Sequence, residues 1–443
     1  MTRATETLRE EPPGSEPQTP LLIYVLGYDQ LLTEESRIFS IDEPRLPLEI
    51  GRGDELTFER AELRLPDRWL SGSHALLERQ GERLLLRDTG SRNGTAVNGA
   101  RIESHFLSDG DLIEVGHSLL CYRLVGRSLA VELPRRTSPR TLCAELVALL
   151  GQVDRIAPST EPVLLLAETG AGKERFAETI HAWSGRRGPF CAIDCGAIPE
   201  NLFESTLFGH QRGAFTGATE ARTGELVRAH RGTLFLDEVG NLSLSAQAKL
   251  LRVLEDQRVT PLGAAQPIQV DVRIIAATNR DLYADDTGFR PDLLRRLAGF
   301  VARLPPLRRR REDLGILVAD LLGELGAKRA AITAAAARQL FCDPFPGNVR
   351  QLRTALRAAA LLAGDGPIDL HHLPPPTEKD AAPAPRVGEE PAPQTTPSME
   401  TIEQALAAAS GNVVRAARAL TTHPRQLYRW IARYQISLDR FRG

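Results

Sequence analysis

A glycine-rich loop between an apolar run and a helical segment constrains this chain more than any other feature. The run Val163–Leu166 leads into Ala167-Glu168-Thr169-Gly170-Ala171-Gly172-Lys173-Glu174. Glycines let backbone N–H groups point at phosphate oxygens, and the lysine adds a point charge there. The order strand, loop, lysine and helix predicts a nucleotide-binding α/β domain. Ala167 replaces a glycine of the strict motif and Glu174 replaces a Ser or Thr, so a structural turn that caps the helix is the alternative.

A second motif supports nucleotide chemistry. Gly232-Thr233-Leu234-Phe235-Leu236-Asp237-Glu238 is an apolar strand that ends in two carboxylates. Asp237 is suited to hold Mg²⁺ and Glu238 to polarise the attacking water. An exposed acidic turn is the other interpretation, but together with the upstream loop the pair predicts hydrolysis of a nucleotide.

The pattern of apolar runs and turn residues changes along the chain and predicts several domains. Short apolar runs broken by turn residues over 21–126 indicate an all-β sandwich. Apolar runs that alternate with helical patterns over 138–304 indicate a parallel α/β sheet, and 305–373 is helical throughout. Segments 1–20, 127–137 and 374–397 are expected to be a disordered tail, a linker and a Pro-rich linker, and 398–443 a helical domain.

Charge and cysteine content exclude other classes. Lys+Arg number 55 against 57 acidic residues, a balance of −2, but segment 398–443 carries seven arginines against three acidic residues, which leaves the rest near −6. A basic tip on a Pro-rich tether suggests a nucleic-acid partner. Five cysteines are too few for a disulfide framework, and Cys191 and Cys195 are expected to be buried thiols. The chain has no run long enough for a membrane span, so we expect a cytoplasmic protein without a membrane partner.

The central domain resembles the AAA+ module of bacterial enhancer-binding proteins, the activators of sigma-54 RNA polymerase. The most specific match is the complete hexapeptide Gly213-Ala214-Phe215-Thr216-Gly217-Ala218. The resemblance implies that this loop contacts sigma-54, that the chain forms a homo-oligomer, from dimer to hexamer, and that ATP and Mg²⁺ are its cofactors. Phe215 is a lone aromatic among small residues, which suits transient contact, although a turn that tucks the ring inward is the alternative.

The same resemblance assigns further nucleotide residues. Glu174 is normal for the family, which leaves Ala167 as the departure in the loop. The loop residues 167–174, Asn279 and Arg350 are implied to bind ATP, and Asp237 and Glu174 to hold Mg²⁺. Arg290 and Arg296 are candidates for arginine fingers that act on a neighbouring subunit, because a permanent planar charge suits a γ-phosphate. Ion pairing on a helix surface is their alternative interpretation.

Asp194 departs from the family pattern. In the family an Asn at this position restrains the catalytic glutamate, whereas an ionised Asp cannot donate a hydrogen bond to Glu238 and repels it. We therefore expect altered coupling between Glu238 and the hexapeptide loop, with a near-isosteric change without effect as the alternative.

The N-terminal sandwich resembles a forkhead-associated (FHA) domain. The matching segments are Gly51-Arg52, Ser71-Gly72-Ser73-His74, Asp88-Thr89-Gly90-Ser91-Arg92-Asn93-Gly94-Thr95, Val97-Asn98-Gly99 and Asp109-Gly110-Asp111. The resemblance implies that Arg52, Ser71 and Asn93 bind phosphothreonine, with Asn98 as a brace. The ligand is either a phosphorylated partner protein or the chain's own tail, at Thr2, Thr5, Thr7 or Thr19. A purely structural FHA fold is the alternative, and Gly72 replaces the usual basic residue.

Segment 398–443 resembles the Fis-type helix-turn-helix of the same activators. Arg425 and Gln426 are candidates for base contacts in upstream enhancer DNA, and Arg429 and Arg433 for phosphate contacts. A solvated basic helix is the alternative, since Thr421 and Pro424 depart from the usual pattern.

The combined expectation is a sigma-54-dependent activator regulated by Ser/Thr-kinase signalling, in which ATP hydrolysis remodels the polymerase holoenzyme. Two rivals stay open: a DNA-binding regulator that has lost hydrolysis, as Ala167 and Asp194 would suggest, and an AAA+ remodeller of another client.

Overall fold

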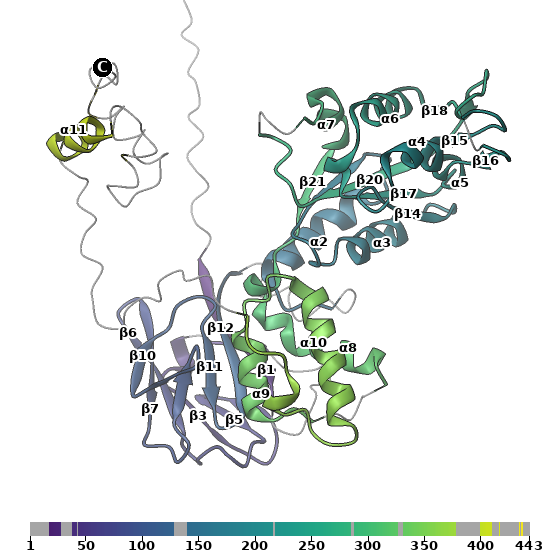
Figure 1. Ribbon diagram of the computed structural model, residues 1–443. Coiled ribbons are helices and arrows are strands. Elements are labelled where there is room, and N and C mark those ends of the chain that lie inside the picture. Colours follow the sequence, from purple (N-terminus) through teal and green to yellow (C-terminus); the bar gives the residue numbers. More distant parts are fainter. Residues whose placement is uncertain are drawn as a thin grey trace, which may run out of the picture. The chain divides into compact units, whose positions relative to one another are not determined.

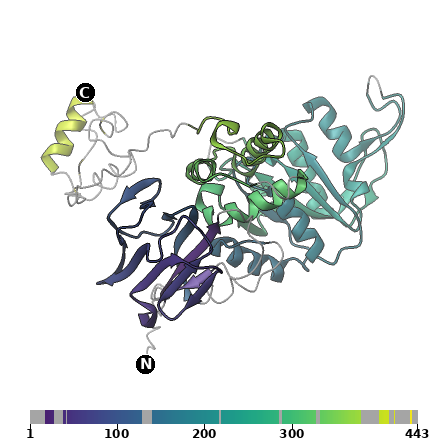
Figure 2. The ribbon, with the colours of Figure 1, turned by 90° about the horizontal axis from the view of Figure 1, so that it is seen from below.

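The computed structural model describes residues 17–27, 38–41, 43–127, 140–215, 218–284, 288–326, 331–377, 399–409, 416, 434 and 436. The chain divides into two compact units, Met1–Thr377 and Glu378–Gly443 (Figures 1 and 2). The first unit contains a β-sandwich, an α/β domain and a helical lid.

The sandwich consists of two six-stranded sheets, as the short apolar runs predicted. One sheet has the order β2-β1-β12-β11-β8-β9 and the other β10-β7-β6-β3-β5-β4. The strands of the first sheet are β1 (Gln18–Leu26), β2 (Ile38–Ser40), β8 (Thr95–Val97), β9 (Ala100–Ile102), β11 (Leu112–Val115) and β12 (Ser118–Gly126). Those of the second are β3 (Leu48–Arg52), β4 (Thr57–Glu59), β5 (Glu62–Leu65), β6 (Ala75–Gln80), β7 (Arg83–Asp88) and β10 (Ser104–Phe106), and the short helix η1 (Glu43–Arg45) precedes β3.

Strand β1 begins earlier than the sequence suggested. Residues 18–20 were expected to belong to a disordered tail, but Gln18, Thr19 and Pro20 pair with the end of β12. The backbone ladder, rather than apolar side chains, extends the strand, so composition gives no signal for it. Thr19, a candidate phosphorylation site of the tail, therefore lies within a strand; Thr2, Thr5 and Thr7 lie outside the described residues.

The α/β domain is built on five parallel strands in the order β14-β17-β20-β13-β21. The strands are β13 (Val163–Leu166), β14 (Phe190–Asp194), β17 (Thr233–Asp237), β20 (Arg273–Thr278) and β21 (Phe300–Arg303). Alternate residues of the strands enter two separate apolar cores, so both faces of the sheet are covered. Figure 1 shows the helices gathered around this sheet. They are α2 (Ala144–Ile156), α3 (Lys173–Trp183), α4 (Glu200–Phe208), α5 (Glu225–Arg228), η3 (Val239–Asn241), α6 (Leu244–Asp256) and α7 (Pro291–Leu297).

Two small hairpins extend from this domain. They pair β15 (Gly209–His210) with β16 (Arg222–Thr223), and β18 (Arg258–Val259) with β19 (Ile268–Gln269). The hexapeptide loop lies between β15 and β16, and Thr216 and Gly217 at its tip are outside the described residues.

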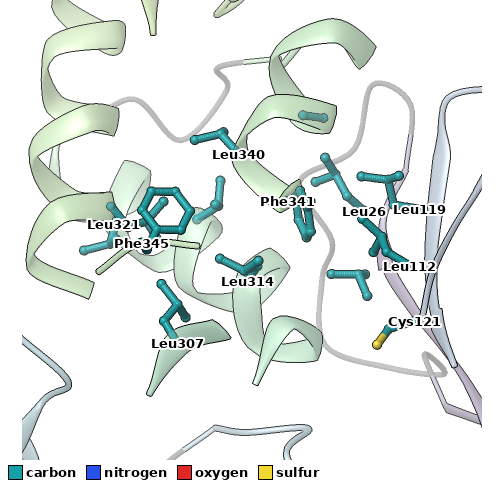
Figure 3. Packing of buried hydrophobic residues seen from close by; sticks show 14 of the residues in the cluster. Leu26, Leu112, Leu119, Cys121, Leu307, Leu314, Leu321, Leu340, Phe341 and Phe345 are labelled. Atoms are coloured by element: carbon teal, nitrogen blue, oxygen red, sulfur yellow. The ribbon is translucent and has the colours of Figure 1, made fainter. Parts of the chain in front are cut away.

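The lid follows β21 and is helical, as predicted. It contains η4 (Leu307–Arg309), η5 (Arg311–Asp313), α8 (Leu314–Glu324), α9 (Ala334–Cys342), α10 (Asn348–Ala363) and η6 (Leu370–His372). Its apolar residues share one core with the outer face of the sandwich sheet that holds β1 (Figure 3). This continuity between sandwich and lid was not expected from the sequence.

In the second unit, α11 (Met399–Ala408) is a helix within segment 398–443, which was expected to be helical. Ile402 and Leu406 are buried one helical turn apart. Arg425, Gln426, Arg429 and Arg433 lie outside the described residues.

The cysteines behave largely as expected. All five are free, and Cys195 is buried, but Cys191 is only partly buried because it lies on the edge strand β14. Within the described ranges, none of the helices combines the length and apolar character that crossing a membrane requires.

Candidate functional sites

The lysine of the glycine-rich loop lies against the two carboxylates that end β17. Lys173 is 5% exposed, and its Nζ donates to Glu238 Oε1 at 2.5 Å and lies 3.1 Å from Asp237 Oδ1. Parallel strands bring these groups together because β13 and β17 end at the same edge of the sheet. The two motifs thus form one site.

The loop conformation depends on glycine at two positions. Gly170 and Gly172 have φ of 76° and 105°, in the left-handed region that other residues avoid. A Cβ on Gly170 would also overlap with the carbonyl oxygen of Gly347 in the lid. Ala167 is buried, and its N–H donates to the carbonyl of Thr278, so the alanine is accommodated where the strict motif has glycine.

The lid holds the loop through Glu168. The carboxylate of Glu168 accepts two hydrogen bonds from Arg308, at 2.7 and 2.6 Å, and one from Asn348 Nδ2 at 3.1 Å. The hydrogen bonds from Arg308 lower the pKa of Glu168. Asn348 is fully buried and also donates to the carbonyl of Thr169. Glu168 therefore fastens the loop to the lid, which the sequence did not suggest.

Asn279, implied to bind ATP, directly follows β20 and contacts the glycine-rich loop. Its Nδ2 donates to Thr169 Oγ1 at 3.0 Å, and its backbone N–H lies 3.4 Å from Glu238 Oε2. Asp194 is paired in register with Asp237 on the neighbouring strand, and its Oδ1 accepts from the backbone N–H of Gly196 at 2.8 Å.

The remaining nucleotide candidates lie at different distances from the loop. Arg350, exposed at the start of α10, has its Cβ beside Gly170. Glu174 is exposed on the first turn of α3. Arg290 forms a two-point ion pair with Asp292, and Arg296 is exposed and donates to the carbonyl of Leu254 at 3.2 Å. The two arginines thus have partners on and beside α7, as a surface ion-pairing interpretation also allows.

The described residues of the hexapeptide are joined by backbone hydrogen bonds and carry an exposed ring. The N–H of Gly213 donates to the carbonyl of Ala218, and the N–H of Ala218 to that of Phe215. Phe215 is 38% exposed and meets His210 edge-on with ring centroids 5.0 Å apart. The ring is therefore not buried in the core.

Loops at one end of the sandwich surround a cavity of about 580 Å³. It brings Arg52, Ser71 and Asn93 together, as predicted. Asp88 shapes the loop that contains Asn93, because its carboxylate accepts hydrogen bonds from Ser91 and Thr95. A cavity with an arginine, a hydroxyl and an amide can bind a phosphate and orient it.

Two further arginines line this cavity and were missed. Arg68 and Arg92 stand beside Arg52, and Arg92 immediately precedes Asn93 in the chain. They supply the positive charge that Gly72 does not. Asn98 lies outside the cavity lining and joins the β8–β9 turn to β11 through Asp111 and Leu112, which suits a brace.

Among the described residues there is no cluster of three or more His, Cys, Asp or Glu side chains arranged to hold a metal. Asp237 and Glu238 remain the carboxylates nearest the loop lysine, and a cation there would also contact nucleotide phosphates, which supply oxygen ligands of their own.

Four family models match the chain. They are the sigma-54 interaction domain over residues 142–302, the FHA domain over 48–116, the AAA+ ATPase lid domain over 308–389 and the bacterial regulatory protein, Fis family, over 398–434.

Known relatives match a large part of the chain. The Nif-specific regulatory protein of Azotobacter vinelandii is 42% identical over 290 residues, which are 62% of this chain and 55% of that protein. The regulatory protein LuxO of Vibrio cholerae is 47% identical over 225 residues, 49% of this chain and 42% of that one. The chain thus spans about half the length of the curated relatives it matches.

NtrX from Brucella abortus is a solved structure similar to this chain, with a TM-score of 0.49, 29% identity and coverage of 66% of this chain and 68% of that one. Along its sequence the chain carries an FHA domain, a sigma-54 interaction AAA+ ATPase domain, its lid and a Fis-type helix-turn-helix, and in these domains it is similar to the sigma-54 activators.

Proposed function

We propose that this chain hydrolyses ATP in a homo-oligomer and uses the energy to activate sigma-54 RNA polymerase. The observation that carries the proposal is Lys173 held between Asp237 and Glu238. A bound nucleotide presents phosphate oxygens to Lys173, and the lysine then leaves Glu238 free to orient water. When ATP binds, Lys173 thus exchanges its carboxylate partners for phosphate oxygens.

Each residue of the site has a role in this reaction. Asp237 would hold Mg²⁺, with Glu174 as a further candidate, and the ion would neutralise charge on the phosphates. Asn279 contacts both Thr169 in the loop and Glu238. A phosphate that shifts the loop can therefore change the position of the Glu238 carboxylate through Asn279. Arg350 approaches from the lid beside Gly170.

Oligomer formation would complete the site. Arg290 immediately precedes α7 and Arg296 lies on it, and we assign both to the γ-phosphate of a neighbouring subunit, in a ring of up to six subunits. On assembly, Arg290 would leave Asp292 and pair with the phosphate of the neighbouring subunit. The loop at Phe215 would then contact sigma-54, and the arginines of 398–443 would hold the ring on enhancer DNA in the cytoplasm.

The FHA cavity would take phosphothreonine on a partner protein or on the chain's own tail. Arg52, Arg68 and Arg92 give it the charge that a dianionic phosphate requires. If Arg52→Ala left kinase-dependent promoter output intact, this part of the proposal would fail.

ATPase assays of the full chain test the central proposal. Activity per subunit should rise with protein concentration, Lys173→Ala should abolish nucleotide binding, and Glu238→Gln should keep binding but lose turnover. Nucleotide binding without turnover in the parent chain would favour the regulator without hydrolysis. Turnover without capture of sigma-54 in the presence of ATP and a metal fluoride would favour a remodeller of another client.

A further inference from the structure

The sandwich and the lid bury a common apolar core. On the sandwich side, β1, β11 and β12 contribute Leu21, Ile23, Val25, Leu112, Leu119 and Cys121. On the lid side, α8 and α9 contribute Leu314, Val318, Leu321, Leu340 and Phe341 (Figure 3). These residues have at most 4% of their surface exposed. The FHA domain and the lid therefore pack together through one continuous apolar core, as the parts of a single domain do.

Gly315 marks the closest approach. It lies on α8, and a Cβ at this position would overlap with the carbonyl oxygen of Val25 in β1. Gly323, on the same helix, has no atom within 4 Å of such a Cβ. A glycine is thus required at 315 by the sandwich and not by the helix itself.

Charged contacts reach the connection between the α/β domain and the lid. Arg123 on β12 donates to Glu312 Oε1 at 2.6 Å and to the carbonyl of Arg309 at 3.3 Å. Glu312 is 1% exposed, so Arg123 partners a charge that has little access to water. At the far side of the core, Arg338 of α9 donates to Glu114 of β11 at 2.8 Å.

The same connection, residues 307–313, holds the phosphate loop. Arg308 pairs with Glu168, and Arg310 Nη2 donates to the carbonyl of Ala171 at 2.7 Å. Asn348 Oδ1 accepts from the N–H of Leu307 at 2.7 Å. One segment therefore touches the FHA domain through Arg309 and Glu312 and the nucleotide loop through the neighbouring arginines.

The phosphothreonine cavity adjoins the strands that face the lid. Trp69, which lines the cavity, stacks on His117 with ring centroids 4.7 Å apart. His117 lies in the turn from β11 to β12, and a Cβ added to Gly116 in that turn would lie 3.0 Å from the backbone carbonyl carbon of Trp69. A ligand that moves Trp69 thus acts on the turn that joins the strands of Glu114 and Arg123.

We propose that the lid-facing surface of the FHA domain positions the phosphate loop, with Arg123 as the positioning residue, and that occupancy of the phosphothreonine cavity changes nucleotide affinity through this surface. The docked arrangement is the one that binds nucleotide, because it fixes residues 307–313 beneath the loop. The inference rests on the proposed binding of ATP and phosphothreonine. Coupling between two ligands is reciprocal, so each must shift the affinity of the other by the same factor.

A pair of matched substitutions tests the first step. In the full chain, Gly315→Ala should weaken binding of a fluorescent ATP analogue at least about fivefold, while Gly323→Ala should leave it unchanged. Both changes add a methyl group to the same helix, so helix propensity is controlled. Equal affinity of the two variants would overturn the inference while leaving ATP binding intact, whereas failure of the parent chain to bind the analogue would overturn the proposed function as well.

Arg123 gives a second, independent arm. Arg123→Met should weaken analogue binding as Gly315→Ala does, and Arg123→Lys should retain part of the parent's affinity. Arg79→Met, which removes an exposed arginine of the same sandwich, is the control and should leave analogue affinity unchanged. In the parent chain, a phosphothreonine peptide pool with randomised flanks should bind with a different affinity when the analogue is present, and Arg123→Met should remove that difference. An unchanged peptide affinity in the parent would refute the coupling, because a merely structural interface has no such linkage.

Discussion

At the scale of single residues, His74 joins two loops that line the cavity proposed to bind phosphothreonine. Its ring is fully buried, Nδ1 accepts from the N–H of Ser71 at 3.1 Å, and Nε2 lies 3.2 Å from the carbonyl of Gly94. An acceptor at Nδ1 and a donor at Nε2 require the neutral ring. Burial lowers the pKa of His74 below its ordinary value of 6.5.

We therefore predict that acid weakens the sandwich. Between the lowered pKa in the folded chain and the ordinary pKa in the unfolded chain, the unfolded state binds more protons, so the free energy of unfolding falls as pH drops below about 6.5. His74→Gln retains a donor and an acceptor but does not titrate, and its melting temperature should depend less on pH over this range. Identical pH slopes of parent and variant would contradict the role assigned to His74.

Asp194 supports a prediction about basal turnover. It lies beside Asp237 across two parallel strands, and its carboxylate is engaged by the N–H of Gly196. In Asp194→Asn the charge next to the carboxylates of Asp237 and Glu238 is gone and an amide donor is present, so we expect basal ATP turnover to fall about threefold or more. Asp256→Asn, an exposed change at the end of α6, is the control. Equal turnover in the parent and in Asp194→Asn would show that the family difference has no effect.

Residues of continuous motifs are the ones whose proximity the sequence could predict. Lys173 begins α3, Asp237 ends β17, and Glu238 and Asn279 directly follow β17 and β20, so the sheet brings them together without further information. The pair Arg123–Glu312 is separated by 189 positions and belongs to two domains. No local sequence pattern predicts such a contact, because each residue taken alone resembles an ordinary charged surface residue.

At the scale of elements, strand β1 shows what composition reveals and what it leaves open. Residues 21–26 are all buried, on both faces of the strand. A sandwich strand with one solvated face alternates apolar and polar residues, so six consecutive buried residues indicate a second packing partner. The run could have signalled that something covers the sandwich, but the identity of the lid as that cover depends on tertiary contacts.

The loop between β15 and β16 carries a prediction about partner contact. Phe215→Ala removes an exposed ring whose neighbour is His210, and the α/β core does not depend on it. We expect ATP turnover within about twofold of the parent and capture of sigma-54 with a metal-fluoride complex at least about tenfold weaker. Leu244→Ala, which truncates another exposed apolar side chain, should change neither quantity; retained capture by Phe215→Ala would exclude the loop as the contact.

At the scale of the whole molecule, the shared core decides how the chain can be divided. Sequence texture places a boundary between the sandwich and the α/β domain, yet the sandwich packs on the lid, which follows the α/β domain in the chain. Deletion of the FHA domain would expose the apolar side chains of α8 and α9 to water, at a cost of roughly 25 cal/mol per Å² of apolar surface. An ATPase rate measured on such a fragment would mix regulation with loss of stability.

Cleavage of the connection avoids this difficulty and gives the last prediction. A protease site introduced between residues 127 and 140 should allow the chain to be cut while the FHA domain stays bound to the remainder, because the buried core and the Arg123–Glu312 and Arg338–Glu114 pairs do not depend on that connection. The two pieces should elute together on size exclusion, and Gly315→Ala should let them separate while Gly323→Ala should not. Separation of the parent pieces would mean that the connection, rather than the shared core, keeps the FHA domain on the lid.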